Sequence, residues 1–222
     1  MTPALKVRRE VSLRGAVGDE AIYYMIQIIP AIDVATEEEY RDTLKKIENS
    51  GVFKGGWVHV DVSDGVFTPW KTISPEVVKK HPTKLKIELH LMVENPKEII
   101  DKLESVDLGR IITHIEVEKS AHIAINPETP VSILDGLQAE SVLIMAIHPG
   151  KQGQEFIPET LEKIKQIRKS HPNILIGVDG GVTPENAKLI IDAGADYLVV
   201  GSHLIEGNID ENLETFWEKI HT

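Results

Sequence analysis

Short β-rich runs alternate with amphipathic segments of helical period along this chain, and that alternation constrains the fold more than any other feature. Eight runs predict strands at 27–32, 57–62, 85–93, 110–117, 121–126, 141–147, 174–179 and 196–201. Helix start signals separate many of them, such as Thr36 before EEEYRDTLKKIENSG and Thr183-Pro184 before ENAKLIIDAG. Eight strands with helical crossovers predict an α/β fold, the (β/α)8 or TIM barrel. A doubly wound open sheet is the alternative, but its first strand lacks the expected glycine fingerprint.

The junction between the fourth and fifth predicted strands departs from this pattern. Only Glu118, Lys119 and Ser120 separate them. Three residues span only ~10 Å when extended, whereas a parallel crossover usually takes a dozen residues or more. We therefore expect the fourth helix of the barrel to be missing or replaced. The outward face of strand four would then need a cover, either the N-terminal segment or another subunit of a homo-oligomer.

Composition limits the remaining possibilities. The 222 residues, 41% of them hydrophobic, suffice for one barrel domain, which we place at 25–222 behind a poorly ordered extension at 1–24. A net charge of −11 argues against nucleic acid or an anionic membrane as the partner. No apolar run approaches the roughly 20 residues of a membrane span, and the N-terminal segment is a poor secretory signal. We therefore expect a cytoplasmic protein without disulfides, because the chain has no cysteine.

Polar side chains interrupt the inner faces of three predicted strands. Side chains alternate between the faces of a strand, so WVHVDV places its valines on one face and His59 and Asp61 on the other. The same alternation directs His90 and Asp179 inward, near the strand ends where barrel enzymes build their sites. Two imidazoles and two carboxylates suit Zn²⁺, Fe²⁺ or Mn²⁺. The structural alternative is a set of hydrogen-bonded core histidines and loop-capping aspartates.

Two glycine-containing turns follow the last two predicted strands. Gly180-Gly181 precedes the helix that starts at Thr183, and Gly201-Ser202 follows strand eight. Glycines allow backbone N–H groups to approach an anion, and the loops after strands seven and eight form the usual phosphate site of a barrel. The glycine pair alone is more typical of an ordinary turn, but the two turns together predict phosphate binding.

Six segments carry a resemblance to a known family. HVDVSDGVFTP, ELHLMVENP, AINPETP, IMAIHPGKQGQEF, VDGGVTPENA and VVGSHLI occur in the order seen in the ribulose-phosphate 3-epimerase family, from about Ile29 to Ile205. The resemblance implies a (β/α)8 barrel that interconverts D-ribulose 5-phosphate and D-xylulose 5-phosphate through a cis-enediolate. It also implies a divalent metal, with zinc as our first expectation and iron(II) or manganese as alternatives. The implied metal ligands are His59, Asp61, His90 and Asp179, with Asp61 and Asp179 also acting as the two acid/bases.

The resemblance extends to the substrate pocket, where some positions depart from it. Met92 and Met145 match methionines that line the intermediate, and HPGKQGQEF matches a flap with Gly150 and Gly153 as hinges. The departures from the family pattern are Ala31, Ser63, Val66 and His148. These leave two other readings open: an epimerase of a ketohexose 6-phosphate such as allulose 6-phosphate, and a non-catalytic relative that binds phosphate or metal.

Overall fold

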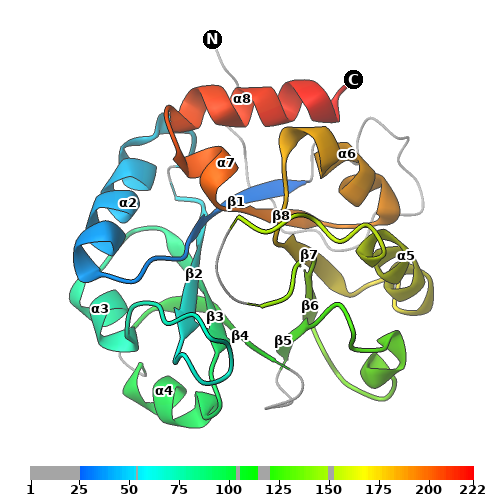
Figure 1. The fold of residues 1–222 in the computed structure, drawn as a ribbon, viewed down its shortest axis with the longest axis horizontal. Coiled ribbons are helices and arrows are strands. Elements are labelled where there is room, and N and C mark those ends of the chain that lie inside the picture. Colours follow the sequence, from blue (N-terminus) through cyan, green and yellow to red (C-terminus); the bar gives the residue numbers. More distant parts are fainter. Residues whose placement is uncertain (1–25, 54, 104–105, 115–120, 150–152) are drawn as a thin grey trace.

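Eight parallel strands close into a barrel in sequence order, and β1 pairs with β8 to complete it (Figure 1). The computed structural model describes residues 26–53, 55–103, 106–114, 121–149 and 153–222. The strands are β1 (Gln27–Ile32), β2 (Trp57–Ser63), β3 (Lys86–Met92), β4 (Leu108–His114), β5 (His122–Ile125), β6 (Ser141–Met145), β7 (Leu175–Asp179) and β8 (Tyr197–Val200). The predicted (β/α)8 barrel is confirmed, and the alternative of an open sheet is wrong.

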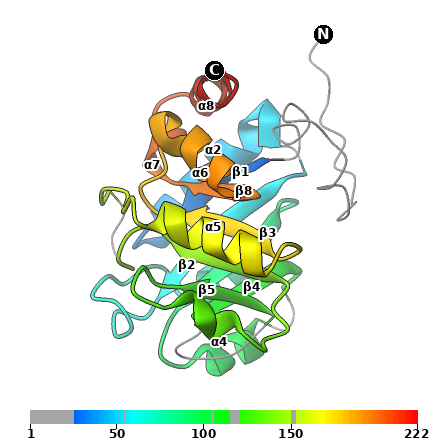
Figure 2. The ribbon, with the colours of Figure 1, turned by 90° about the vertical axis from the view of Figure 1, so that its right-hand side faces the viewer.

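Helices form a ring outside the strands, as Figures 1 and 2 show from two directions. They are α2 (Glu37–Asn49), α3 (Pro75–Lys80), α4 (Pro96–Lys102), α5 (Thr160–Ser170), α6 (Pro184–Ala193), α7 (Ser202–Ile205) and α8 (Ile209–Ile220), with 3₁₀ turns η1 (Gly51–Phe53) and η2 (Val131–Leu134). The predicted start signals are confirmed. Thr36 and Glu39 form a capping box at the start of α2, and Pro184 occupies the first turn of α6.

The strands separate two apolar cores. The outer core lies between strands and helices and includes Val58, Val60 and Val62 of β2. The inner core fills the barrel and consists of Ile29, Ala31, Ile112, Ala124, Leu143, Met145, Tyr197 and Val199. Because the valines of β2 face outward, the alternating positions of the same strand face the barrel interior. The predicted inward orientation of His59 and Asp61 is thereby confirmed.

The β4–β5 junction, where we expected the fourth helix to be missing or replaced, runs through residues 115–120, which lie outside the described residues. β4 begins at Leu108, two residues earlier than predicted, and residues 115–117 of the predicted strand lie outside the described residues. The two strands pair with Thr113 opposite Ile123 and His114 opposite Ala124. The chain therefore has to return by only about two residues, roughly 7 Å along the strand and ~5 Å across. Residues 115–121 can span that distance without a helical crossover.

The outward face of β4 and β5 is not bare where the structure describes it. Thr113, Ile123 and Ile125 have exposed fractions of 1%, 0% and 0%. Ile123 and Ile125 belong to the same core cluster as Leu134, in the short turn η2 between β5 and β6. These three side chains therefore need no further cover from the N-terminal segment or from another subunit. Ile115 and Val117, for which we expected the same cover, lie outside the described residues. In the described part of the chain, no helix is long and apolar enough to cross a membrane.

Candidate active site

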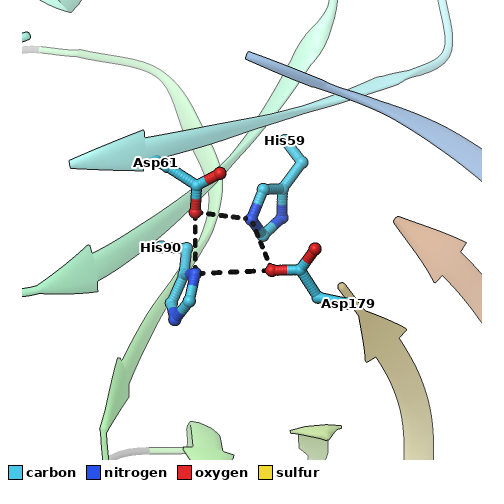
Figure 3. Close-up of side chains that lie close together, drawn as sticks. All are labelled: His59, Asp61, His90 and Asp179. Atoms are coloured by element: carbon cyan, nitrogen blue, oxygen red, sulfur yellow. Dashed lines mark hydrogen bonds and ion pairs between the residues drawn. The ribbon is translucent and has the colours of Figure 1, made fainter. Parts of the chain in front are cut away.

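Four polar side chains from three strands converge inside the C-terminal mouth of the barrel (Figure 3). His59 and Asp61 come from β2, His90 from β3 and Asp179 from β7, and one nitrogen or oxygen of each lies within 4.8 Å of the others. Asp61 Oδ1 is 3.2 Å from His59 Nε2 and 2.8 Å from His90 Nδ1. Asp179 Oδ2 is 3.9 Å from each of the same two nitrogens. The four residues that alternation selected therefore form one cluster.

Strand register accounts for this convergence. Asp61 is paired with His90 across the β2–β3 ladder, and Met145 is paired with Asp179 across β6–β7. Parallel strands end at the same edge of a barrel, so these paired positions fall at one depth. His59 lies two residues before Asp61 and enters the barrel one layer below it.

Each histidine uses its second ring nitrogen for a buried contact away from the cluster. His59 Nδ1 is 2.6 Å from Glu88 Oε1, and both side chains are fully buried. His90 Nε2 is 3.0 Å from His114 Nε2, and the two rings are stacked. Such outer contacts fix the orientation of a ligand histidine and decide which nitrogen carries the proton.

The pKa values of the four cluster residues shift in different directions. Burial raises the pKa of Asp179 to about 8, with the charge of Asp61 adding to the effect. Burial also opposes ionisation of Asp61, but the two histidines outweigh it and lower its pKa. Among the imidazoles, burial lowers the pKa of His90 to about 4. For His59, burial is outweighed by Asp61 and Glu88, and the pKa is raised.

The donor set fits a divalent cation. Donor atoms bound at about 2.0–2.1 Å to a tetrahedral ion lie roughly 3.3 Å apart, close to the separations of 2.8, 3.2 and 3.9 Å in the cluster. Burial, together with the charge of Asp61, raises the pKa of Asp179 and so disfavours its ionised form, whereas a bound cation would favour that form. Imidazole and carboxylate ligands are those preferred by zinc, iron(II) and manganese.

A cavity of about 350 Å³ opens over the cluster. Its lining includes Asp61 and Asp179, together with the predicted pocket and phosphate positions Met92, Met145, Gly153, Gly180, Gly181, Gly201 and Ser202. Its size falls in the usual range for small-molecule sites. Gly150 lies outside the described residues. Among the described residues, β4 and β5 contribute nothing to the lining.

Glycine is required at the turn after β7. Gly180 and Gly181 have φ of +103° and +63°, the left-handed region that other residues avoid. A Cβ on Gly181 would lie 2.5 Å from the backbone nitrogen of Phe156, so the flap segment packs directly on this turn. Asn186 Nδ2 donates to Gly181 O at 2.8 Å and holds the turn at the start of α6.

Sequence reasoning missed several side chains of the site. Asp33 lines the cavity and accepts a hydrogen bond of 2.9 Å from Trp70 Nε1. Glu88 forms an ion pair with Arg110 inside the barrel. Alternation along β3 directs Glu88 inward, but nothing in the sequence identified Arg110 as its partner. The available signal was alternation on β4, where Arg110 shares the face of Ile112 and His114.

The four departures from the family pattern have different surroundings. Ala31 lines the cavity, whereas Ser63 donates to Trp70 O at 2.6 Å and holds the loop after β2. Val66 is 65% exposed. His148 Nδ1 lies 2.8 Å from Glu128 Oε1, and both side chains are largely exposed.

A closed (β/α)8 barrel with two histidines and two aspartates clustered at its C-terminal mouth has the arrangement of a barrel enzyme. Residues 27–205 match the Ribulose-phosphate 3 epimerase family, and the chain belongs to that family. The protein is therefore an epimerase-type isomerase.

Similar proteins agree with this assignment. The chain is 33% identical to ribulose-phosphate 3-epimerase of Bacillus subtilis over 201 residues, covering 80% of this chain and 91% of that protein. It is 34% identical to the cytoplasmic isoform of Oryza sativa over 171 residues, covering 67% of this chain and 75% of that protein. The crystal structure of orotidine 5'-phosphate decarboxylase from Pyrococcus horikoshii has a TM-score of 0.58 at 18% identity, covering 88% of this chain and all of that one. That likeness concerns the fold alone.

Proposed function

We propose that this protein interconverts D-ribulose 5-phosphate and D-xylulose 5-phosphate by removing the C3 proton from one face of the sugar and delivering a proton to the other face. The His59, Asp61, His90 and Asp179 cluster carries this proposal, because it supplies two carboxylates beside a cavity of sugar-phosphate size. The family match and the names of the relatives support the choice of a pentose phosphate.

Asp61 and Asp179 are the proposed acid/base pair. The C3 hydrogen is acidic because the neighbouring C2 ketone can accept the electron pair, giving an enediolate. In one direction, ionised Asp61 takes the C3 proton and protonated Asp179 delivers one to the opposite face. The lowered pKa of Asp61 and the raised pKa of Asp179 favour this starting state. One turnover leaves the two protonation states exchanged, which is the starting state for the reverse reaction.

The four cluster residues would also hold a divalent cation, with zinc as the first choice and iron(II) or manganese as alternatives. Bound there, the cation would supply positive charge against the oxygens of the enediolate. Met92 and Met145 line the same cavity and present a polarizable surface that donates no proton. Gly180, Gly181, Gly201 and Ser202 would receive the phosphate, with Gly153 in the segment that covers it.

The test uses Asp61→Asn and Asp179→Asn, with the exposed Asp42→Asn as a control. We expect both site variants to lose epimerisation in a coupled assay for xylulose 5-phosphate, because an amide cannot accept the proton. In D2O, each variant should still exchange the C3 hydrogen of one epimer, and the two variants should act on opposite epimers. The metal content of each variant is measured in parallel, and allulose 6-phosphate is the comparison substrate.

Near-normal epimerase activity in either variant would refute the two-base assignment. Turnover of allulose 6-phosphate but not of ribulose 5-phosphate by the parent protein would replace the substrate while retaining the mechanism. No turnover of either substrate by the metal-loaded parent would support the non-catalytic alternative.

A further inference from the structure

A buried ion pair lies inside the barrel at the level of His59, one layer below Asp61 and His90. Glu88 of β3 has an exposed fraction of 0%, and Arg110 of β4 has one of 8%. Arg110 Nε donates to Glu88 Oε2. Enclosing two charges in a barrel is costly, and a pair of similar-sized apolar residues is often at least as stable. The stability of the fold therefore does not by itself require an ion pair at this position.

Two aromatic rings lie against the guanidinium of Arg110. It lies 4.5 Å from the ring centre of Trp57 and 4.5 Å from that of Tyr197. Two glycines make room for these rings, because a Cβ on Gly109 would lie 2.4 Å from Trp57 and one on Gly177 would lie 2.1 Å from Tyr197. A planar cation packed against two aromatic rings can present its Nε–H in only a narrow range of directions.

Glu88 connects this fixed cation to the active site. Its Oε2 accepts from Arg110, and its Oε1 lies 2.6 Å from His59 Nδ1. An ionised carboxylate can only accept, so His59 must carry a proton on Nδ1. The other ring nitrogen, Nε2, then points at Asp61 and Asp179, at 3.2 and 3.9 Å. The contacts form one continuous series from Arg110 to the cluster.

We propose that Arg110 is a positioning residue for this site, which acts through Glu88 to hold the His59 Nδ1–H and to direct Nε2 of that ring toward the cation position. The cation itself rests on the proposed function, whereas the hydrogen bond of His59 does not.

The main variant is Arg110→Met, which keeps the length of the side chain and removes its charge and its donor. Lys86→Met is the matched control, because Lys86 also lies over the Trp57 ring, at 5.6 Å, but is exposed at the start of β3. The probes are Zn²⁺ and Co²⁺ alone, titrated against a chelator of known affinity. Imidazole N–H signals of His59 are followed by NMR with and without Zn²⁺.

We expect Arg110→Met to weaken metal binding about 10- to 100-fold, the usual effect of losing an outer-shell contact. Simple charge balance predicts the opposite sign, because removing a positive charge near the site would favour a cation. The His59 Nδ1–H signal should be protected from water exchange in the parent and lose that protection in the variant. Arg110→Lys should restore part of both properties, and Lys86→Met should match the parent.

Glu88→Gln provides a second route if Arg110→Met does not fold. We expect the same loss of affinity and protection, and little further loss when Arg110→Met is added, because the two residues act in series. Unchanged or tighter metal binding with a still protected His59 Nδ1–H, in either folded variant, would overturn the proposal. So would an unprotected His59 Nδ1–H in the parent. A parent that binds metal as described but does not epimerise ribulose 5-phosphate would refute only the proposed function.

Discussion

Replacing Gly177 with alanine should destabilise the barrel from its interior. Gly177 of β7 pairs with Tyr197 of β8, whose ring lies over the glycine. An added Cβ would lie 2.1 Å from Tyr197 Cζ, more than 1 Å inside an ordinary contact of about 3.5–4.0 Å between carbons. Tyr197 is 1% exposed and stacked on Arg110, so its ring has no free space to enter.

The expected cost follows from this overlap. Overpacking a well-packed core costs about 1–3 kcal/mol and occasionally more. For a domain of this size, each kcal/mol lowers Tm by about 2–4 °C, so we expect a fall of roughly 2–12 °C. Equilibrium unfolding in urea and thermal unfolding followed by circular dichroism measure both quantities. Gly51→Ala is the control, because a Cβ there would meet nothing within 4 Å.

A second-site change tests the cause. In the Tyr197→Leu background the ring is absent, so Gly177→Ala should cost at least 1 kcal/mol less than in the parent, a coupling expected for residues in contact. A Gly177→Ala variant within about 0.5 kcal/mol of the parent, the usual scatter of neutral substitutions, would show that the overlap argument is wrong.

Three further predictions concern the metal, the N-terminal segment and the phosphate turn. Removing the metal with a chelator should abolish activity and lower Tm by roughly 5–11 °C relative to protein with metal at 100 times its Kd, about 2.7 kcal/mol; a fully active metal-free protein would contradict this. Deleting residues 1–24 should leave Tm and turnover unchanged, because every strand and the family match lie within residues 27–205; a large fall in Tm would contradict the separate extension that we propose. Gly181→Ala should raise KM more than it lowers kcat, because φ is +63° and Phe156 leaves no room for a Cβ; an unchanged KM would count against phosphate binding at this turn.

Periodicity predicted the barrel because most strands could be recognised from their own pattern of apolar and polar residues. The two-residue alternation of β2 placed His59 and Asp61 inside, and the outer valines confirmed it. The limits of β4 were less accessible, since the alternation continues through IITHIEV without a glycine, a proline or another turn residue to mark an end. The structure begins β4 at Leu108, two residues before the predicted start, and pairs Thr113 with Ile123.

The site was predictable where residues share a depth at the strand ends and unpredictable where a contact depends on the volumes of side chains inside the barrel. His59, Asp61 and His90 lie on neighbouring strands, so a shared depth was enough to bring them together. The partnership of Arg110 with Tyr197 joins β4 to β8 through the interior, and it depends on the volumes of side chains that alternation does not measure. Asp33 was missed because a carboxylate just after a strand is usually a loop residue.

The short β4–β5 connection also has a consequence for how the protein folds. Thr113 and Ile123 pair although they are only ten positions apart in sequence, against nineteen for His122 and Ser141 of β5 and β6. Halving the length of a loop lowers the entropic cost of closing it by about 0.6 kcal/mol, and parallel pairing is slow because such loops are normally long. The β4–β5 pair is therefore the parallel contact that the unfolded chain can form most readily, with the neighbouring strands adding to it on either side.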